Sequence, residues 1–303
     1  MNQTLCTPTL PNTTRFSSND AISTAYTHPP SNINPDARSS ILTKASHSST
    51  AFYTPHINRF TRMIMDEEWP NAIDIIQMDP SMARKRIIAH EFMGASRTSE
   101  VLPIHLALSE ADVPIELIQA LVRAHPDSVR KTETGYERNC IHIALKSFAS
   151  DAVVSYLIQL YPEACQMQDS LGRLPLHYSI SNIHSLPLIQ EVIHVYPEAV
   201  KAWDNKGWTP LMVACQTYSS PDLIRILLSI APETILMTAK KGSTALGIAA
   251  AFEKNHSGAI VPILEEMEGF FRELPVIQNY RKAAGKEIYQ TQYFYPRVRH
   301  NVV

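Results

Sequence analysis

Short apolar segments with helical spacing alternate along the chain with polar turns. One example is residues 169–200, in which a turn containing Asp169 and Gly172 precedes a short apolar segment that starts at Leu174. A polar break and a second apolar segment follow, and this second segment ends at Tyr196-Pro197. Its apolar residues recur at the spacing of one helix face, as do those of the next unit. The positions are Leu188, Ile189, Val192, Ile193 and Tyr196 in the first unit, and Leu223, Ile226, Leu227 and Ile230 in the second.

Two markers repeat with the same period. The first is a helix-opening motif whose third residue lies at positions 105, 142, 177, 212 and 247, which are 37, 35, 35 and 35 residues apart. The second is a helix-closing proline at positions 80, 126, 162, 197 and 232, with steps of 46, 36, 35 and 35. A fixed period of this length is typical of stacked repeats, so we predict a repeat array.

The markers have physical reasons. Proline fits the first position of a helix because its missing N–H would have no partner there, and after an apolar run it ends the helix. Gly172 and Gly207, each three residues after an aspartate, supply the positive φ of a tight turn. Helices of about ten residues span only about 15 Å, so one helix pair cannot bury its apolar face alone. Neighbouring pairs are therefore expected to stack into a mainly all-α solenoid.

The motifs resemble the ankyrin repeat. Asp-x-x-Gly-x-Thr-Pro-Leu at 204–211 and Leu-Pro-Leu-His at 174–177 carry the resemblance, which covers about residues 60–280. It implies an ankyrin-type solenoid of stacked helix pairs with short finger turns, in which the Asp/Gly turn tips a finger and the next motif opens the inner helix. The residues of this structural signature are Pro103, His105, His142, Gly172, Pro175, His177, Gly207, Thr209 and Pro210.

Some positions depart from the family pattern and define a long-repeat variant. The period is 35 rather than 33, leucine replaces the threonine at Leu102 and Leu174, and Met212 and Gly247 replace the histidine. The 34-residue tetratricopeptide repeat is the alternative helical-pair architecture. It lacks an Asp-x-x-Gly turn and a helix-opening Pro-x-His motif, so the ankyrin-like reading is preferred.

Composition divides the chain into three parts. Residues 1–55 are rich in Ser, Thr and Pro and show no apolar period, so a disordered tail is predicted. The repeat array is assigned to residues 56–282, with about six repeats and degenerate terminal ones, as capping repeats usually are. Residues 283–303 form an aromatic and basic tail that includes 289–295. The shortage of acidic residues in 1–55 leaves organelle targeting with a cleavable N-terminus as an alternative.

Charge and cysteine content narrow the class of function. The net charge of −2 shows no excess of basic residues of the kind that binds nucleic acid. No apolar run of about 18 residues occurs, so no membrane partner is expected. Cys140, Cys165 and Cys215 stand at positions that favour small apolar residues and are expected to be reduced and buried. We expect a monomer in the cytoplasm, with nuclear or organellar locations left open.

Candidate chemistry is scarce. The histidines at 105, 142 and 177 stand one repeat apart, and helices packed about 8–10 Å apart cannot bring them to one ion. We expect them to bind backbone groups at the helix start. His90-Glu91 lacks the second histidine of a metalloprotease helix, because residue 94 is Gly94. No catalytic residue, metal site or cofactor is predicted. The rival hypothesis is an enzyme or metal site around His90, Glu91 and the acidic run Asp66–Glu68.

The remaining candidate is a binding surface on the fingers. Aromatic residues and arginine dominate interface hot spots, and such residues follow the turn glycines. The predicted partner-binding residues are Tyr136, Arg173, Lys206, Trp208, Lys240 and Lys241. The leading hypothesis is a non-catalytic scaffold or adaptor that binds a protein partner on a concave repeat surface.

Overall fold

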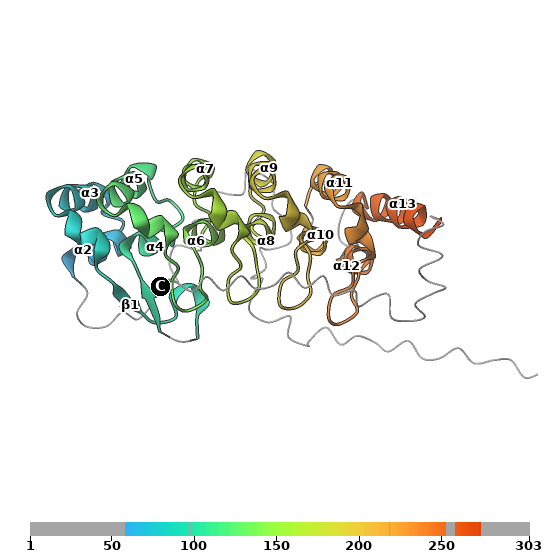
Figure 1. The fold of residues 1–303 in the computed structure, drawn as a ribbon, viewed down its shortest axis with the longest axis horizontal. Helices are drawn as coiled ribbons and strands as arrows, with labels where there is room; N and C mark the ends of the chain where they lie inside the picture. Colours follow the sequence, from blue (N-terminus) through green and yellow to red (C-terminus); the bar gives the residue numbers. More distant parts are fainter. Residues whose placement is uncertain (1–57, 97, 218, 253–257, 274–303) are drawn as a thin grey trace, which may run out of the picture. The chain divides into compact units, whose positions relative to one another are not determined.

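The computed structural model describes residues 58–273, except 97, 218 and 253–257. The predicted segments 1–55 and 283–303 lie outside the described residues, as do the last residues of the predicted array. The described part is an all-α repeat solenoid, apart from one short hairpin and an isolated bridge. Figure 1 shows two rows of helices with loops projecting beneath them.

Each unit consists of a short inner helix, a longer outer helix and one turn of 3-10 helix. The inner helices are α2 (Arg59–Met65), α4 (Pro103–Leu108), α6 (Cys140–Lys146), α8 (Pro175–Ser181), α10 (Pro210–Gln216) and α12 (Ala245–Phe252). The outer helices are α3 (Trp69–Met78), α5 (Ile115–Ala124), α7 (Asp151–Leu160), α9 (Leu186–Val195), α11 (Pro221–Ile230) and α13 (Ile260–Glu273). Each inner helix from α4 to α10 packs against the inner helices before and after it.

The repeated proline has a more specific role than the sequence indicates. It ends the outer helix and also begins a five-residue 3-10 helix. These helices are η2 (Pro80–Arg84), η4 (Pro126–Arg130), η5 (Pro162–Gln166), η6 (Pro197–Lys201) and η7 (Pro232–Leu236). The residue before each proline has an extended ψ of 70° to 85°, as expected from the clash between a proline ring and a preceding helical residue. The chain thereby turns from the outer helix toward the next finger.

The first finger is an antiparallel hairpin that the sequence analysis did not predict. Strand β1 (Ile87–Ala89) pairs with β2 (Ser99–Val101), with Ile88 opposite Glu100, and η3 (Phe92–Gly94) lies in the connection. The acidic run Asp66–Glu68 was expected in the first turn of a helix, where negative charge suits the helix dipole. It forms the turn between α2 and α3 and does not lie in the first turn of a helix, because α3 begins at Trp69.

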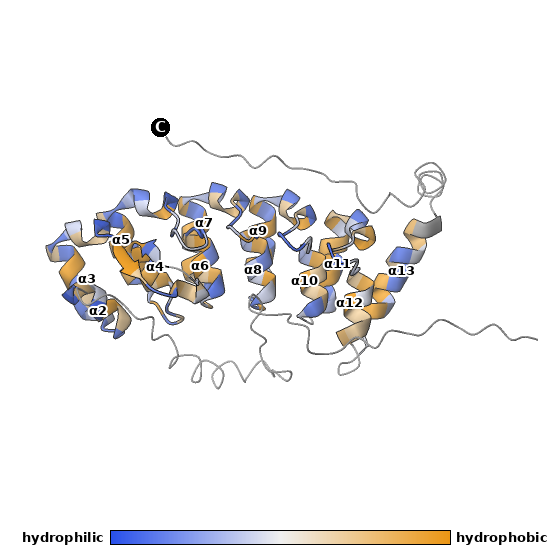
Figure 2. Ribbon diagram, turned by 90° about the horizontal axis from the view of Figure 1, so that it is seen from below, coloured by the Kyte–Doolittle hydropathy of each residue, from blue (hydrophilic) through white to orange (hydrophobic). Residues whose placement is uncertain are grey.

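The core lies between successive helix pairs, and Figure 2 shows that the helices carry both apolar and polar stretches. The predicted apolar face of α9 is correct for Leu188, Ile189, Val192 and Ile193, which are all buried. On α11 the prediction is partly wrong. Ile230 is 38% exposed, while the buried positions are Leu223, Ile224, Leu227 and Leu228. Both helices therefore bury residues at i, i+1, i+4 and i+5. The three described cysteines, Cys140, Cys165 and Cys215, are buried free thiols.

We predict that Leu227→Ala destabilises the array by about 2–5 kcal/mol, because Leu227 is 0% exposed and its removal leaves a cavity between units. Ile230→Ala on the same helix removes an apolar side chain that is 38% exposed, so a loss below about 1 kcal/mol is expected. Urea unfolding of both variants measures the difference. Equal losses would show that the core does not run along the Leu227 face.

Candidate functional site

The fingers are turns held by an aspartate side chain. The backbone N–H groups of Leu171 and Arg173 both donate to Asp169 Oδ1, at 2.9 Å each. In the next finger Lys206 and Trp208 donate in the same way to Asp204 Oδ1, at 2.8 and 2.9 Å. Aspartate is suited to this role because its short side chain can accept from backbone N–H groups two and four residues ahead. The turns are closed by Gly172 and Gly207, whose φ values are 74° and 77°.

Successive fingers are joined by backbone hydrogen bonds. Ser170 N donates to Tyr136 O at 2.8 Å, Asn205 N to Leu171 O at 2.8 Å, and Lys240 N to Lys206 O at 3.1 Å. The fingers approach so closely that a Cβ atom on Gly172 would lie 2.9 Å from the backbone nitrogen of Asn205. The finger row is therefore one hydrogen-bonded unit along its length.

Replacement of Gly172 by alanine is predicted to destabilise the array by about 2 kcal/mol more than replacement of Gly242. Both glycines have a left-handed φ, of 74° and 80°, so both variants share the strain of a side chain in that region. An added Cβ at Gly242 meets no atom within 4 Å, whereas at Gly172 it meets the backbone of the neighbouring finger. Thermal unfolding of Gly172→Ala and Gly242→Ala isolates the close approach. Equal melting temperatures would contradict it.

The finger before α6 differs from the turn pattern that the sequence predicts. Gly135 was expected to take the positive φ, which would place Tyr136 in the series with Arg173 and Trp208. The left-handed residue is instead Glu137, with φ of 57°. The structural counterpart of Arg173 is therefore Arg138. The longer side chain of Glu133 replaces aspartate here and accepts from the N–H of Tyr136 at 2.8 Å and of Arg138 at 3.3 Å, so the turn accommodates one more residue.

Arginines at the finger bases form buried ion pairs with the aspartate of the next finger. Arg138 Nε lies 3.8 Å from Asp169 Oδ2, and the two side chains are 4% and 0% exposed. Arg173 Nε lies 3.6 Å from Asp204 Oδ2, with side chains 3% and 1% exposed. Charges buried this far are tolerated when they are paired and hydrogen-bonded. The aspartates therefore serve both their own turn and the arginine of the preceding finger.

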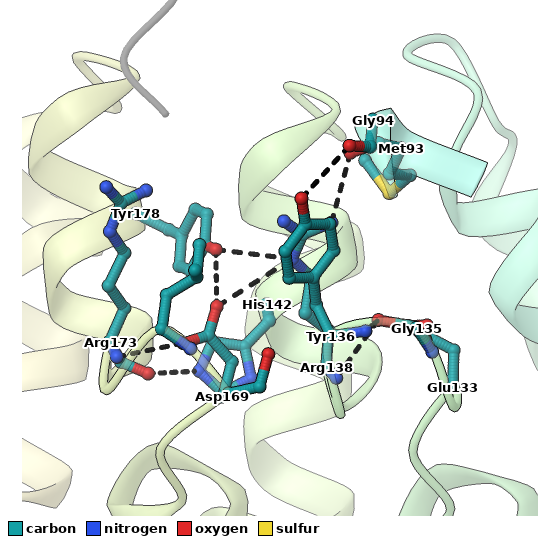
Figure 3. A network of polar contacts seen from close by, with 12 residues as sticks. Met93, Gly94, Glu133, Gly135, Tyr136, Arg138, His142, Asp169, Arg173 and Tyr178 are labelled. Atoms are coloured by element: carbon teal, nitrogen blue, oxygen red, sulfur yellow. Dashed lines mark hydrogen bonds and ion pairs between the residues drawn. The ribbon is translucent and has the colours of Figure 1, made fainter. Parts of the chain in front are cut away.

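Tyr178 of α8 connects this network to the inner helices (Figure 3). Its hydroxyl group donates to Asp169 Oδ2 at 2.6 Å and accepts from Arg138 Nε at 3.2 Å. Burial raises the pKa of Tyr178 to about 12, so the hydroxyl remains a donor. On the other side, Arg138 Nη1 donates to Met93 O at 3.2 Å, which ties the network to the first finger.

The predicted contact residues fall into two groups, namely residues that are buried or half-buried and lysines that are exposed. Arg173 is buried in an ion pair, so it does not present an exposed guanidinium as the prediction assumed. Tyr136 is half-buried, its hydroxyl donates to Gly94 O, and its ring lies 4.2 Å from Arg138 Cζ. Trp208 is also half-buried.

The predicted lysines Lys206, Lys240 and Lys241 are exposed on two adjacent finger tips. These tips are joined by the hydrogen bond between Lys240 N and Lys206 O. We call these three residues the basic finger tips. The sequence analysis missed Arg138 and Tyr178 and assigned Asp169 to a turn alone, because Arg138 contacts residues 31 and 40 positions away that no local motif marks.

The signature histidines bind backbone groups and do not converge. Nδ1 of His105, His142 and His177 accepts from the N–H of the residue three before it, at 3.2 to 3.3 Å. The Nε2–H group then donates to the carbonyl of Lys131, Arg173 or Trp208 in the next finger, at 3.1 to 3.2 Å.

In the two units that lack the histidine, the residue before the inner helix is a threonine, whose hydroxyl group binds a different N–H group. Thr209 Oγ1 accepts from Met212 N at 3.3 Å, and Thr244 Oγ1 accepts from Gly247 N at 3.0 Å. The hydroxyl group caps the N–H of the third helical residue, as Asn139 Oδ1 does for His142 N at 3.0 Å, whereas the imidazole binds the N–H of the residue before the helix.

The histidines make the stability of the array depend on pH. Burial lowers the pKa of His105 and of His142 to about 4, and it also lowers that of His177. Between pH 4 and 6.5 the unfolded chain therefore binds protons that the folded chain does not, so stability falls as the pH falls through this window. His105 and His142 are each expected to lower the stability by about 2 kcal/mol between pH 7 and 5.

The variant His142→Met copies the residue found at Met212. It is predicted to be less stable than the wild type at pH 7, yet to lose about 2 kcal/mol less on acidification to pH 5. Urea unfolding at both pH values measures this, with His194→Gln as the control because His194 is exposed on α9. An unchanged pH dependence in His142→Met would contradict the assignment.

The residues of the rival enzyme or metal hypothesis are not assembled into a metal site in the described part of the chain. Glu91 lies in the loop of the hairpin with φ of 53°, and Asp66–Glu68 forms the turn before α3. No group of three or more His, Cys, Asp or Glu side chains in residues 58–273, outside the gaps, is arranged to hold a metal ion. The same described residues contain no helix that is both long enough and apolar enough to cross a membrane.

Known proteins resemble this class of stacked helical repeat. The family model of the ankyrin repeat matches residues 206–235, which cover a finger, α10 and α11. No curated protein matches the chain significantly. Among solved structures, a chain from the complex of the Bd0816 predatory endopeptidase from Bdellovibrio bacteriovorus with the immunity protein Bd3460 is similar. The identity is 13% and the TM-score 0.55, covering 69% of this chain and 98% of that chain. This likeness concerns the fold alone.

Proposed function

We propose that this chain is a non-catalytic scaffold or adaptor that binds a protein partner on the surface formed by its fingers and inner helices. The ankyrin-repeat match at 206–235 supports this class of function. The observation that carries the proposal is the basic finger tips: Lys206, Lys240 and Lys241 are exposed on fingers whose backbones are hydrogen-bonded to each other. Fixed charges of one sign on a rigid row favour fast and specific association with an acidic partner surface.

Rigidity of the finger row also supports binding. The hydrogen bonds between successive fingers and the buried Arg173–Asp204 pair hold the finger bases before any partner arrives. A surface that is ordered in advance loses less conformational entropy on association, so moderate contacts suffice for a stable complex. Half-buried Trp208 adds aromatic area beside Lys206.

The test uses the full chain as bait in an extract of its native cells, followed by identification of the bound proteins. The affinity of the purified partner is then measured for the triple variant Lys206→Ala, Lys240→Ala, Lys241→Ala. We expect Kd to rise about tenfold, because three charge contacts at about 0.5 kcal/mol each give about 1.5 kcal/mol, and about 1.4 kcal/mol corresponds to a tenfold change. We also expect the loss to shrink at high salt.

The matched control removes three exposed arginines that lie outside the basic finger tips: Arg84→Ala, Arg123→Ala and Arg225→Ala. Arg123 and Arg225 lie on outer helices, and Arg84 lies at the end of η2. Binding should be unchanged in this variant. A partner that is lost by the control variant and retained by the finger variant would place the interface on the outer helices and overturn the proposal.

A further inference from the structure

Lys146 is the last residue of the inner helix α6. In the next two units the same helical position is occupied by Ser181 and Gln216, the last residues of α8 and α10. A long cationic side chain is therefore not a requirement of the inner helix at this position. Lys146 differs from its counterparts in bringing a positive charge to this position.

Lys146 is half-buried, and two guanidinium groups lie near its ammonium group. Burial and the nearby guanidinium groups of Arg138 and Arg173 lower its pKa to about 8, whereas the carboxylate of Asp169 opposes this effect. The residue nevertheless retains contact with solvent, since it is only half-buried. A ligand arriving from solution can therefore reach it.

Among the residues that the structure describes, the charge of Lys146 has no partner. Within the described residues its side chain makes no hydrogen bond and no ion pair, although its backbone carbonyl accepts from Asn182 Nδ2 at 3.1 Å. The oxygens of Asp169 are already engaged by two backbone N–H groups, by Tyr178 and by Arg138. An ammonium group that is partly removed from water without an acceptor is less stable than a paired one, and an external acceptor would relieve this cost.

The side chains near Lys146 are held in place by their own contacts and do not take the place of a ligand. Arg138 is held between Asp169 and Met93 O, and its guanidinium carbon lies 4.2 Å from the ring centre of Tyr136 and 5.8 Å from that of Tyr178. Arg173 Cζ lies 5.7 Å from the same Tyr178 ring. Two guanidinium groups with buried side chains thus flank the ring of Tyr178 (Figure 3).

We propose that Lys146, supported by the positive field of Arg138 and Arg173, receives a carboxylate from an acidic segment of the protein partner. This inference rests on the proposed function and names the chemistry of the partner at one point of the same surface. A carboxylate fits because it is a pure acceptor and neutralises the ammonium with a charge-assisted hydrogen bond. The basic finger tips would attract the same acidic segment from outside.

The test uses a fluorescein-labelled hexaglutamate peptide and the full chain at about 150 mM salt, where charges more than about 8 Å apart are largely screened. Fluorescence polarisation should show saturable binding to hexaglutamate and none to hexaglutamine. Lys146→Met keeps most of the apolar stem and removes the charge, and Lys146→Ser copies the residue at Ser181. Both are expected to weaken hexaglutamate binding at least fivefold, while Lys146→Arg is expected to retain it.

The outcomes separate this inference from the proposed function. Binding that is weakened by the finger-tip triple variant and unaffected by Lys146→Met overturns the role of Lys146 and leaves the finger surface supported. The absence of saturable hexaglutamate binding also overturns the inference, while the captured protein partner still tests the finger surface independently. Thermal unfolding of the Lys146 variants shows that they are folded, so a loss of binding is not a loss of structure.

Discussion

The structure depends on burial between successive helix pairs. An inner helix of seven residues and an outer helix of ten are too short to be stable alone in water, so each pair needs neighbours to cover its apolar face. The buried residues Leu188, Ile189, Val192 and Ile193 on one outer helix, and their counterparts on the next, provide this cover. The fingers follow the same rule, because their backbone groups bond to the fingers on either side. Each unit is therefore defined by its neighbours.

Much of this arrangement could be predicted from the sequence because its signals are local. A proline that opens or closes a helix, and a glycine three residues after an aspartate, act through the backbone of their own segment. Pro175, Pro197 and Gly172 consequently mark real boundaries. The outer helix α11 was partly misread, because an apolar stripe of isoleucine and leucine can be drawn through Ile230 as well as through Leu228. Packing decides between these faces.

The candidate site was less accessible to sequence reasoning. Arg173 was predicted to be a contact residue because it follows the turn glycine. In the structure it is buried and paired with Asp204, which lies 31 residues later. Gly135 suggested the wrong turn position, since the extra residue in that finger moves the left-handed conformation to Glu137. Interactions between units depend on which residues the stack brings together, and a single sequence does not state that. The half-buried position of Lys146 and its charged neighbours are likewise properties of the folded chain that no sequence motif marks.

The Arg–Asp pairs also have a direction. Asp169 accepts the arginine of the finger before it, while Arg173, in the same finger, pairs with the aspartate of the finger after it. The segment 169–203 thus carries one acceptor and one donor, and a second copy inserted beside the first would find complementary groups at both ends. The series ends where Trp208 follows Asp204 and Ala239 stands at the next acidic position. The middle of the finger row could therefore be lengthened by whole units without losing an ion pair, whereas the finger that contains Ala239 could not continue the series.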